Sequence, residues 1–551
     1  MISTSRSQRY IPAFVLFASL LFVAACRPVP TPEEQALSEV EGFDLPSLPE
    51  ISYPCTPEYP TRKIMRQMED LGPGYISDQI ILTGKQEDIK FIAEAIESID
   101  DEVGPLDPFD PLKAANGDIV FVVLYPLNLA PGQSVWDVMI EANQLALNEN
   151  KLAFAEPNYL TGSGPGGGTG INGAPGGFAG TLDSYARQEF LSQWAFTGES
   201  SIHLFDQGDP RVWTPGSLTG ANVTVAVFDT TPLPEGGHGI SWAVQPFDLC
   251  VWQPGLMFGH SGVPSGPVQY GQPITPGEHG LFVTGLAHRV APAAQYTLIE
   301  VLDAEARGDI QTLLRAMRLY TASLGSLDHT VINLSLGLEV EQQPGLINRD
   351  AIKSLIDMLE KMSLPYYLDS QVGLDLPVIS LGVSMANYQE QGAVIVAAAG
   401  NDRRDTPNAP ARFPEVIGVA ASNAIRIDAC FTNLGDLAAP GGDAPDRALC
   451  SMDASSDCPV DKAGCEYALI SLVSQNASQT GYAYWQGTSF ATPLVSGLST
   501  LLREAHPGWT PVDVRTAIEC GLGPGDAAAS TTIDRLGLGL IDVDTTINHC
   551  P

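Results

Sequence analysis

Basic side chains are scarce in this sequence, and their scarcity excludes a class of partner. Among 551 residues there are 28 lysines and arginines against 64 aspartates and glutamates, which gives a formal net charge of −36. Such a charge repels phosphate backbones and anionic lipid headgroups over a Debye length. We therefore expect no nucleic-acid partner, and we interpret the charge as a means of keeping an exposed protein soluble.

Several sequence patterns of metal sites and hydrolases are also missing. There is no C-x-x-C pair, no paired histidine and cysteine spacing typical of zinc, and no D-x-[DN]-x-[DN]-G calcium loop. We predict no metal site, although acidic clusters leave structural calcium open. A lipase or esterase would need G-x-S-x-G, and the nearest runs, GHSGV and GVSMA, lack the final glycine.

The apolar N-terminal segment is too short and too early for a lasting membrane span. Arg6 and Arg9 precede an apolar run at residues 11–23, a pattern typical of an export signal over residues 1–25. The following VAAC resembles the bacterial lipoprotein box, in which the cysteine, here Cys26, is acylated and anchors the chain to the membrane. An ordinary secretory signal is the alternative. Both readings predict an extracytoplasmic protein.

Nine cysteines suit an oxidising compartment outside the cytoplasm. If Cys26 carries lipid, eight remain, and sequence spacing alone does not fix how they pair. The pairings that we consider are Cys458 with Cys465, Cys520 with Cys550, and Cys430 with Cys450, which leaves Cys55 and Cys250 over.

Composition divides the chain into further segments. Residues 26–54 are rich in proline and glutamate without an apolar period, which is typical of a tether. Residues 55–161 predict a small α+β domain in ferredoxin-like order, with strands at 76–82, 118–125 and 152–156 and helices at 86–99 and 135–147. The glycine-rich stretch 162–180 predicts a flexible linker.

Residues 181–551 predict an α/β domain. The apolar runs VTVAVF, YTLIEVL, TVINLSL, AVIVAAA and VIGVAA are separated by helix-length segments. Continuous apolarity indicates strands covered on both faces, hence a three-layer arrangement with a parallel sheet between helices. Asp229 directly follows VTVAVF and Asn401 follows AVIVAAAG, so we expect both at the carboxyl rim of the sheet, where ligands bind.

The chain also offers each group that hydrolysis through a covalent intermediate requires. GTSFATP, residues 487–493, places Ser489 in a turn of small residues that opens a helix. EHGLFVTG, residues 278–285, puts His279 at the start of a second helix. Asp229 is then expected to orient the imidazole, while the Asn401 side chain and the Ser489 backbone N–H donate to the oxyanion.

These motifs and their order resemble the subtilisin family of serine peptidases, in which the triad runs Asp, His, Ser. The likeness spans most of residues 185–545, through VTVAVFDTT, HGLFVTG, VINLSLG, AVIVAAAGND and GTSFATPLVSG. It implies a serine endopeptidase that acts on polypeptides and needs no cofactor for its chemistry. It also implies a substrate-binding strand at Ser335, Leu336 and Gly337 and a specificity pocket lined by Ala398, Ala399 and Gly400.

Some positions depart from the family pattern. Thr231, Leu281 and Phe282 replace a glycine, a threonine and a histidine that the family usually has, and we expect these changes to alter packing rather than the triad. The long gap before His279 holds two further histidines, His238 and His260, neither of which has a suitable helix. An insertion between Leu338 and Ala393 either reshapes the cleft, through Tyr366 and Tyr367, or is only structural.

The domain before the linker resembles the family's propeptide, because its ending AFAEPNYL is similar to the segment that threads into the cleft. The resemblance implies an intramolecular chaperone and inhibitor that is later cut off, near Leu160 or inside the glycine linker. The competing interpretation is a protease-shaped binding protein in which the departures signal lost catalysis.

Overall fold

A computed structural model of the chain describes residues 75–100, 107–108, 112–113, 119–162, 193–196, 201–204, 218–231, 242–243, 250–252, 276–302, 306–338, 378–442, 468–476, 479–523 and 535–550. Contacts divide the chain into two units, Met1–Ile51 and Ser52–Pro551, and every described residue belongs to the second. The predicted export signal, the tether with Cys26 and the linker that follows Gly162 lie outside the described residues.

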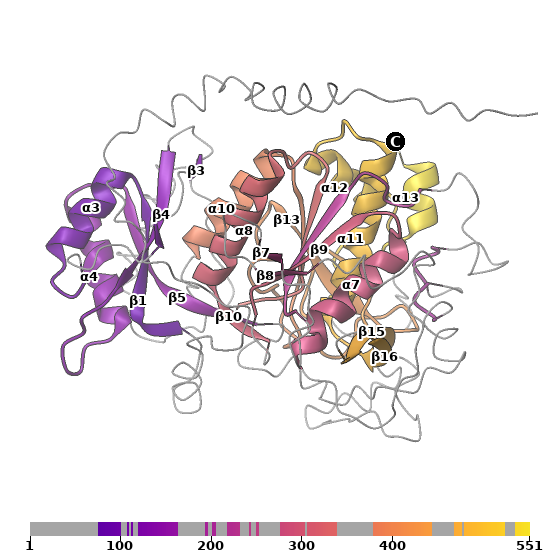
Figure 1. The fold of residues 1–551 in the computed structure, drawn as a ribbon, viewed down its shortest axis with the longest axis horizontal. Coiled ribbons are helices and arrows are strands. Elements are labelled where there is room, and N and C mark those ends of the chain that lie inside the picture. The colour runs from indigo at the N-terminus through magenta and orange to yellow at the C-terminus, as the bar shows by residue number, and fades with distance from the viewer. Residues whose placement is uncertain are drawn as a thin grey trace, which may run out of the picture. The chain divides into compact units, whose positions relative to one another are not determined.

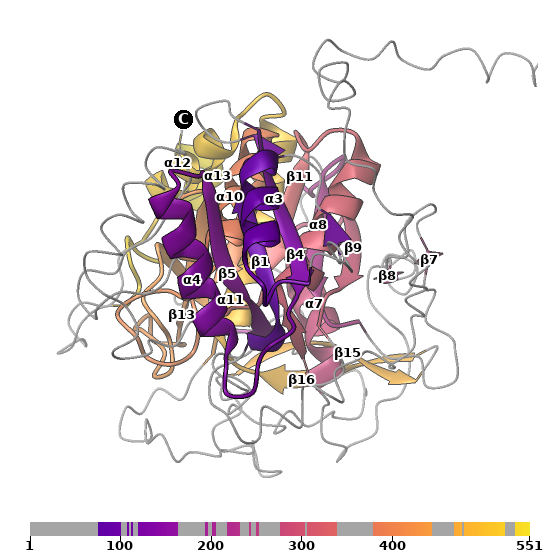
Figure 2. The same ribbon diagram turned by 90° about the vertical axis from the view of Figure 1, so that its left-hand side faces the viewer.

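The first described part is a small α+β domain (Figure 1). Its elements are β1 (Tyr75–Gly84), α3 (Gln86–Ala95), β2 (Asp107–Pro108), β3 (Leu112–Lys113), β4 (Ile119–Pro126), α4 (Val135–Asn148) and β5 (Ala153–Gly162). The strands pair antiparallel in the order β5-β1-β4-β2, and β3 also pairs with β4. Both helices lie on one face of this sheet (Figure 2), so the structure has the predicted ferredoxin-like order.

The larger part is built on an eight-stranded sheet in the order β14-β13-β12-β11-β6-β9-β8-β7. Pairing is parallel from β14 to β9, and β8 and β7 extend one edge antiparallel. The strands are β6 (Thr224–Asp229), β7 (Trp242–Ala243), β8 (Cys250–Trp252), β9 (Gln295–Glu300), β11 (Thr330–Leu334), β12 (Val394–Ala398), β13 (Val416–Ser422) and β14 (Leu437–Pro440).

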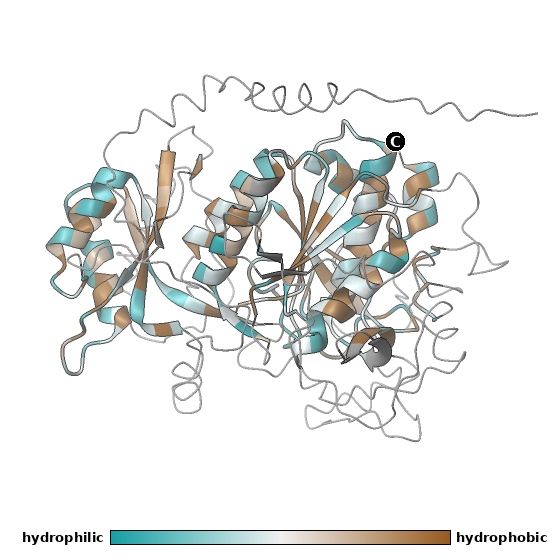
Figure 3. Cartoon of the chain, viewed as in Figure 1, coloured by the Kyte–Doolittle hydropathy of each residue, from teal (hydrophilic) through white to brown (hydrophobic). Residues whose placement is uncertain are grey.

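Helices cover both faces of this sheet (Figure 1). The helices α7 (His279–Val290) and α11 (Thr488–Ala505) lie on one face, and α8 (Ile310–Leu324) and α10 (Ile379–Glu390) lie on the other. Strand β6 shows the alternation: Val225 and Val227 join the core under α7 and α11, while Ala226 and Phe228 join the opposite core. The strands are therefore hydrophobic on both sides, and hydrophobic stretches of them are brown in Figure 3.

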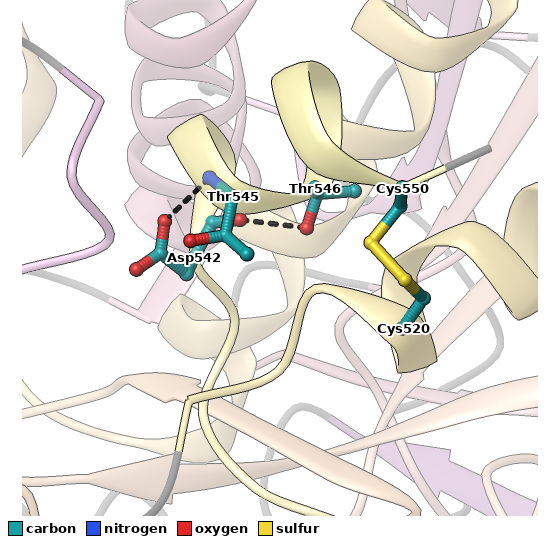
Figure 4. The surroundings of a disulfide bond; sticks show 5 residues. All are labelled: Cys520, Asp542, Thr545, Thr546 and Cys550. Atoms are coloured by element: carbon teal, nitrogen blue, oxygen red, sulfur yellow. Dashed lines mark hydrogen bonds between the residues drawn. A yellow bond between two sulfur atoms is a disulfide. The ribbon is translucent and has the colours of Figure 1, made fainter.

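The remaining elements complete the domain. They are η3 (Pro276–Glu278), β10 (Arg307–Asp309), the hairpin of β15 (Leu469–Asn476) and β16 (Gln479–Trp485), α12 (Pro511–Cys520) and α13 (Val543–His549). A disulfide between Cys520 and Cys550 joins α12 to the end of α13, with a Cα to Cα distance of 5.9 Å (Figure 4). This confirms one predicted pairing.

The other predicted pairings stay predictions. Cys430 is also disulfide-bonded, but Cys450, Cys458 and Cys465 lie outside the described residues.

The structure confirms the predicted fold class, and the differences are in element boundaries. The helix predicted over residues 86–99 ends at Ala95, because Ile99 turns away to pair with Leu127. Strand β5 continues to Gly162 instead of ending at Glu156. Among the described residues, no helix has both the length and the apolar character that a membrane crossing requires.

Candidate active site

Asp229 is the last residue of β6 and is fully buried. Its Oδ1 accepts a hydrogen bond from the Thr230 backbone N–H at 2.7 Å and lies 2.8 Å from Nδ1 of His279. Its Oδ2 is buried and has no hydrogen-bond donor among the described residues. A buried carboxylate with so few donors strongly favours an N–H on the facing imidazole nitrogen, which selects one tautomer of His279.

The start of α7 is fixed against the loop that follows β6. The Thr230 hydroxyl donates to the Gly277 carbonyl oxygen at 2.9 Å and accepts from the Gly280 backbone N–H at 2.9 Å. A Cβ placed on Gly280 would come within 2.1 Å of the Thr230 carbonyl oxygen and 3.0 Å of the Asp229 Cβ. Glycine at 280 is therefore what allows the histidine helix to approach the aspartate strand.

Ser489 lies in the first turn of α11 and is 3% exposed. Its hydroxyl donates to the Ser335 carbonyl oxygen at 3.1 Å, and the Ser335 hydroxyl donates to the Ser489 carbonyl oxygen at 2.7 Å. The ring of Phe490, the next residue, has its centroid 5.2 Å from the imidazole of His279. The first turn of α11, which carries Ser489, thus lies beside the imidazole that is paired with Asp229.

Asn401 follows β12 and is bound to the serine turn. Its Oδ1 accepts from the Thr488 backbone N–H at 2.9 Å and from the Thr488 hydroxyl at 3.0 Å. Because a backbone N–H can only donate, these bonds identify the oxygen of the amide, and the Nδ2 donor lies on the other branch. That Nδ2 would be 3.6 Å from a Cβ on Gly487, so it lies against the turn that carries Ser489. Sequence reasoning did not anticipate this role of Thr488.

The predicted substrate-binding strand is paired with the chain's own N-terminal domain. Gly337 donates to the Gly162 carbonyl oxygen at 2.8 Å and accepts from the Gly162 backbone N–H at 3.1 Å. On its other side, the end of β5 pairs antiparallel with β10, with Leu160 opposite Asp309. Residues 160–162 therefore lie as a strand between β10 and Gly337. Ser335 and Leu336, which precede Gly337, are buried.

The predicted pocket residues Ala398, Ala399 and Gly400 are buried at the end of β12. Gly400 has a φ of +109°, and a Cβ there would come within 2.3 Å of the Asn433 Nδ2. The same Nδ2 donates to the Ala399 carbonyl oxygen at 3.0 Å. Close by in the chain, burial raises the pKa of Asp402 to about 6, although a hydrogen bond from Asn408 opposes the shift.

The remaining residues that the sequence analysis singled out lie in helix α7, after β6 or outside the described residues. Leu281 and Phe282 are buried in α7, consistent with a packing role, and the Thr231 hydroxyl donates to Glu300 at 3.1 Å. His238, His260, Tyr366, Tyr367 and Cys26 lie outside the described residues. The described residues contain no cluster of histidine, cysteine, aspartate or glutamate that could hold a metal ion.

Comparison with known proteins gives a family match over much of the larger domain. The sequence model of the subtilase family matches residues 266–530. This range includes His279, Asn401 and Ser489 but begins after Asp229.

Two relatives and one solved structure are among the similar proteins. Subtilisin NAT of Bacillus subtilis subsp. natto is 28% identical over 370 residues, which cover 62% of this chain and 74% of the relative. Minor extracellular protease Epr of Bacillus subtilis is 26% identical over 341 residues, covering 60% and 39%. The structure of fervidolysin from Fervidobacterium pennivorans shares 17% identity, covers 86% of this chain and 61% of its own, and has a TM-score of 0.45.

We predict that Gly280→Ala separates His279 from Asp229, because the added methyl group collides with the Thr230 backbone. Misplacement by about 1 Å lowers the reactivity of a catalytic pair roughly a hundredfold. The measurement is the rate at which a fluorophosphonate labels Ser489. Gly508→Ala is the matched control, since nothing lies within 4 Å of a Cβ there. Equal labelling rates in both variants would contradict the argument.

Proposed function

We propose that this chain, a subtilisin-like serine peptidase, cleaves peptide bonds through an acyl-enzyme on Ser489. In this proposal His279 is the general base, Asp229 orients it, and Asn401 donates to the oxyanion. The observation that carries the assignment is the 2.8 Å contact of buried Asp229 and His279 beside the helix turn of Ser489. Asp229, His279 and Ser489 lie at the end of a strand and at the starts of two helices, as the sequence predicted.

The proposed reaction has two similar halves. The Ser489 Oγ attacks the carbonyl carbon while its proton passes to His279, whose other nitrogen keeps its N–H on Asp229. The negative charge that develops on the substrate oxygen is met by the Asn401 Nδ2 and the Ser489 backbone N–H, near the start of α11 where the helix dipole is also favourable. His279 then returns the proton to the leaving amine. In the second half, water attacks the ester of the acyl-enzyme with His279 again taking the proton, and the carboxylic acid product leaves Ser489.

We propose that the N-terminal domain is a propeptide that inhibits the enzyme until it is cut off. Support comes from the strand at residues 160–162, which occupies the place of a substrate strand between β10 and Gly337. Gly162 pairs antiparallel with Gly337. The chain direction after Gly162 therefore points toward Ser335, whose carbonyl oxygen accepts the Ser489 hydroxyl. This direction favours cleavage in the glycine-rich linker over cleavage near Leu160.

Side chains of β5 strengthen the proposed inhibitory contact. Both oxygens of Glu156 accept backbone N–H groups at the start of α10, from Ile379 at 2.8 Å and from Ser380 at 2.9 Å. Asn158 accepts from the Gln311 backbone N–H at 3.2 Å at the start of α8. Helix starts have unpaired N–H groups and a positive dipole end, so the propeptide caps two helices of the catalytic domain at once.

The location of the enzyme remains part of the proposal. Residues 1–25 are proposed as the export signal and Cys26 as the lipid anchor, so that removal of the propeptide leaves it on the membrane and frees the protease. The relative Epr is named an extracellular protease, which agrees with export. Polypeptides outside the cytoplasm are then the substrates.

Two substitutions test the assigned roles. Ser489→Ala should lower peptide hydrolysis by about six orders of magnitude and abolish fluorophosphonate labelling, because the nucleophile is lost. Asn401→Ala should lower kcat about a hundred to a thousand fold with little change in KM, because the amide acts mainly in the transition state. Residual labelling of Ser489→Ala would refute the nucleophile, and an unchanged kcat in Asn401→Ala would refute the oxyanion donor.

We expect the wild-type chain to yield a mature form that begins after Gly162, since the chain direction after Gly162 points toward Ser335 and Ser489. N-terminal sequencing of the released protein identifies the cut. Ser489→Ala serves as the control and should remain full-length if the enzyme processes itself. Immunoblots that show only a full-length, membrane-retained form of the wild type would rule out this maturation.

Propeptide inhibition should weaken as pH rises through about 7. Burial raises the pKa of Glu156 from 4.5 to about 7, against the opposing hydrogen bonds from Ser380 and Ile379, and burial raises the pKa of Asp309 at the start of α8 as well. A carboxyl whose pKa is raised in the bound state takes up a proton on binding, so binding is favoured at low pH and lost above the bound pKa.

The experiment compares fluorophosphonate labelling of the full-length wild type and Glu156→Gln between about pH 5 and 9. Their ratio cancels the pH dependence of the labelling reaction itself, which both share. Wild type should label about tenfold or more faster than Glu156→Gln above pH 8, and this ratio should fall steadily as the pH is lowered from about 7 toward 5. Glu141→Gln, at an exposed position of α4, is the control. A ratio that does not change with pH would show that Glu156 is not responsible.

A further inference from the structure

Two aromatic rings contact the imidazole of His279, and a third ring packs behind them. This aromatic cluster consists of Phe282, Trp485 and Phe490. The His279 centroid lies 5.6 Å from Trp485, with the two rings nearly perpendicular at 89°, and 5.2 Å from Phe490, with a tilt of 47°. Phe282 supports both neighbours, at 5.6 Å from Trp485 and 4.5 Å from Phe490. Trp485 and Phe490 also contact each other at 5.2 Å.

The cluster is buried and comes from separate elements. Phe282 lies on α7 and is 0% exposed, Trp485 ends β16 and is 4% exposed, and Phe490 lies on α11 and is 1% exposed. The hairpin of β15 and β16 is also bound to α7, because the Ser471 hydroxyl donates to the Phe282 carbonyl oxygen at 2.6 Å. Trp485 is therefore held on the helix that begins with His279.

Trp485 and Phe490 belong to the same short segment as the nucleophile. Trp485 lies four positions before Ser489, and Phe490 directly follows it. One continuous stretch of chain thus carries the hydroxyl and two of the rings that contact the imidazole. A movement of His279 away from Ser489 would require these rings to repack in a dense core.

The hydrogen bond to Asp229 holds only one nitrogen of the imidazole. A single bond fixes that atom but leaves the ring free to tilt about it, whereas proton transfer from a serine requires the second nitrogen to be aligned within a fraction of an ångström. Rings packed at two different angles oppose such tilting. We propose that Trp485 is a positioning residue that holds the imidazole of His279 in its reactive orientation toward Ser489.

This inference rests on the proposed triad, and it explains why Phe282 stands where the family usually has a histidine. An apolar ring at that position completes the contact with Trp485, whereas a second imidazole there would leave polar nitrogens to be satisfied in the core. The role differs from simple core packing, because it predicts an effect on the chemical step that goes beyond loss of stability.

The test compares Trp485→Leu and Trp485→Phe in the enzyme with a matched core variant, Phe196→Leu. Phe196 is fully buried in the same hydrophobic core as Trp485, but its ring contacts Arg289 at the other end of α7. The measurements are kcat and KM for a peptide substrate and the rate of fluorophosphonate labelling, at a temperature where all variants are folded by circular dichroism.

Trp485→Leu should lower kcat and the labelling rate about tenfold with KM changed less than about twofold, since the ring acts on orientation and not on substrate binding. Trp485→Phe should recover most of the loss, and Phe196→Leu should show none. Wild-type kcat in Trp485→Leu, or an equal fall in Phe196→Leu, would overturn the inference. Absence of labelling in wild type would overturn the proposed triad, and this inference with it.

Discussion

The structure depends on the hydrogen bond between Asp229 and His279 in a site that excludes water. Both side chains are almost completely buried, so the carboxylate is stabilised chiefly by the Thr230 N–H and the imidazole. A buried charge with few partners requires β6 and α7 to approach each other closely. Gly280 allows this approach because it has no side chain, and Thr230 fixes it through hydrogen bonds with Gly277 and Gly280. The rest of the domain keeps these two elements in register.

The same principle, a polar group used to join two elements, recurs at the other site residues. Thr488 ties Asn401 to the serine turn, and Ser335 exchanges hydrogen bonds with Ser489 across the end of β11. Each contact fixes a loop that follows a parallel strand. Loops are the variable part of an α/β fold, so these bonds are what fixes the segments of the site relative to one another.

Much of this arrangement could be predicted from the sequence, because local sequence patterns indicate both the fold and the residues of the proposed triad. Continuous apolar runs identified the buried strands, and small residues around Ser489 and His279 identified helix starts with close backbone approach. The contact of Trp485 with His279 was not predictable, since it joins residues far apart in the chain and the sequence gives no period or motif for it. Glu156 was missed for a related reason: within β5 it resembles any strand residue, and only the fold brings it to the first turn of α10.

The two residues that the sequence did not reveal have opposite requirements. Trp485 contacts both His279 and Phe282, so a change at Phe282 or Trp485 constrains the other through packing. Glu156 binds α10 from a part of the chain that is proposed to be removed, and its loss would leave two N–H groups at the start of that helix without their partner. The first contact must persist through every turnover, whereas the second must be weak enough to break. Nearly complete burial among apolar rings suits the first requirement, and a carboxyl that changes its charge near neutral pH suits the second.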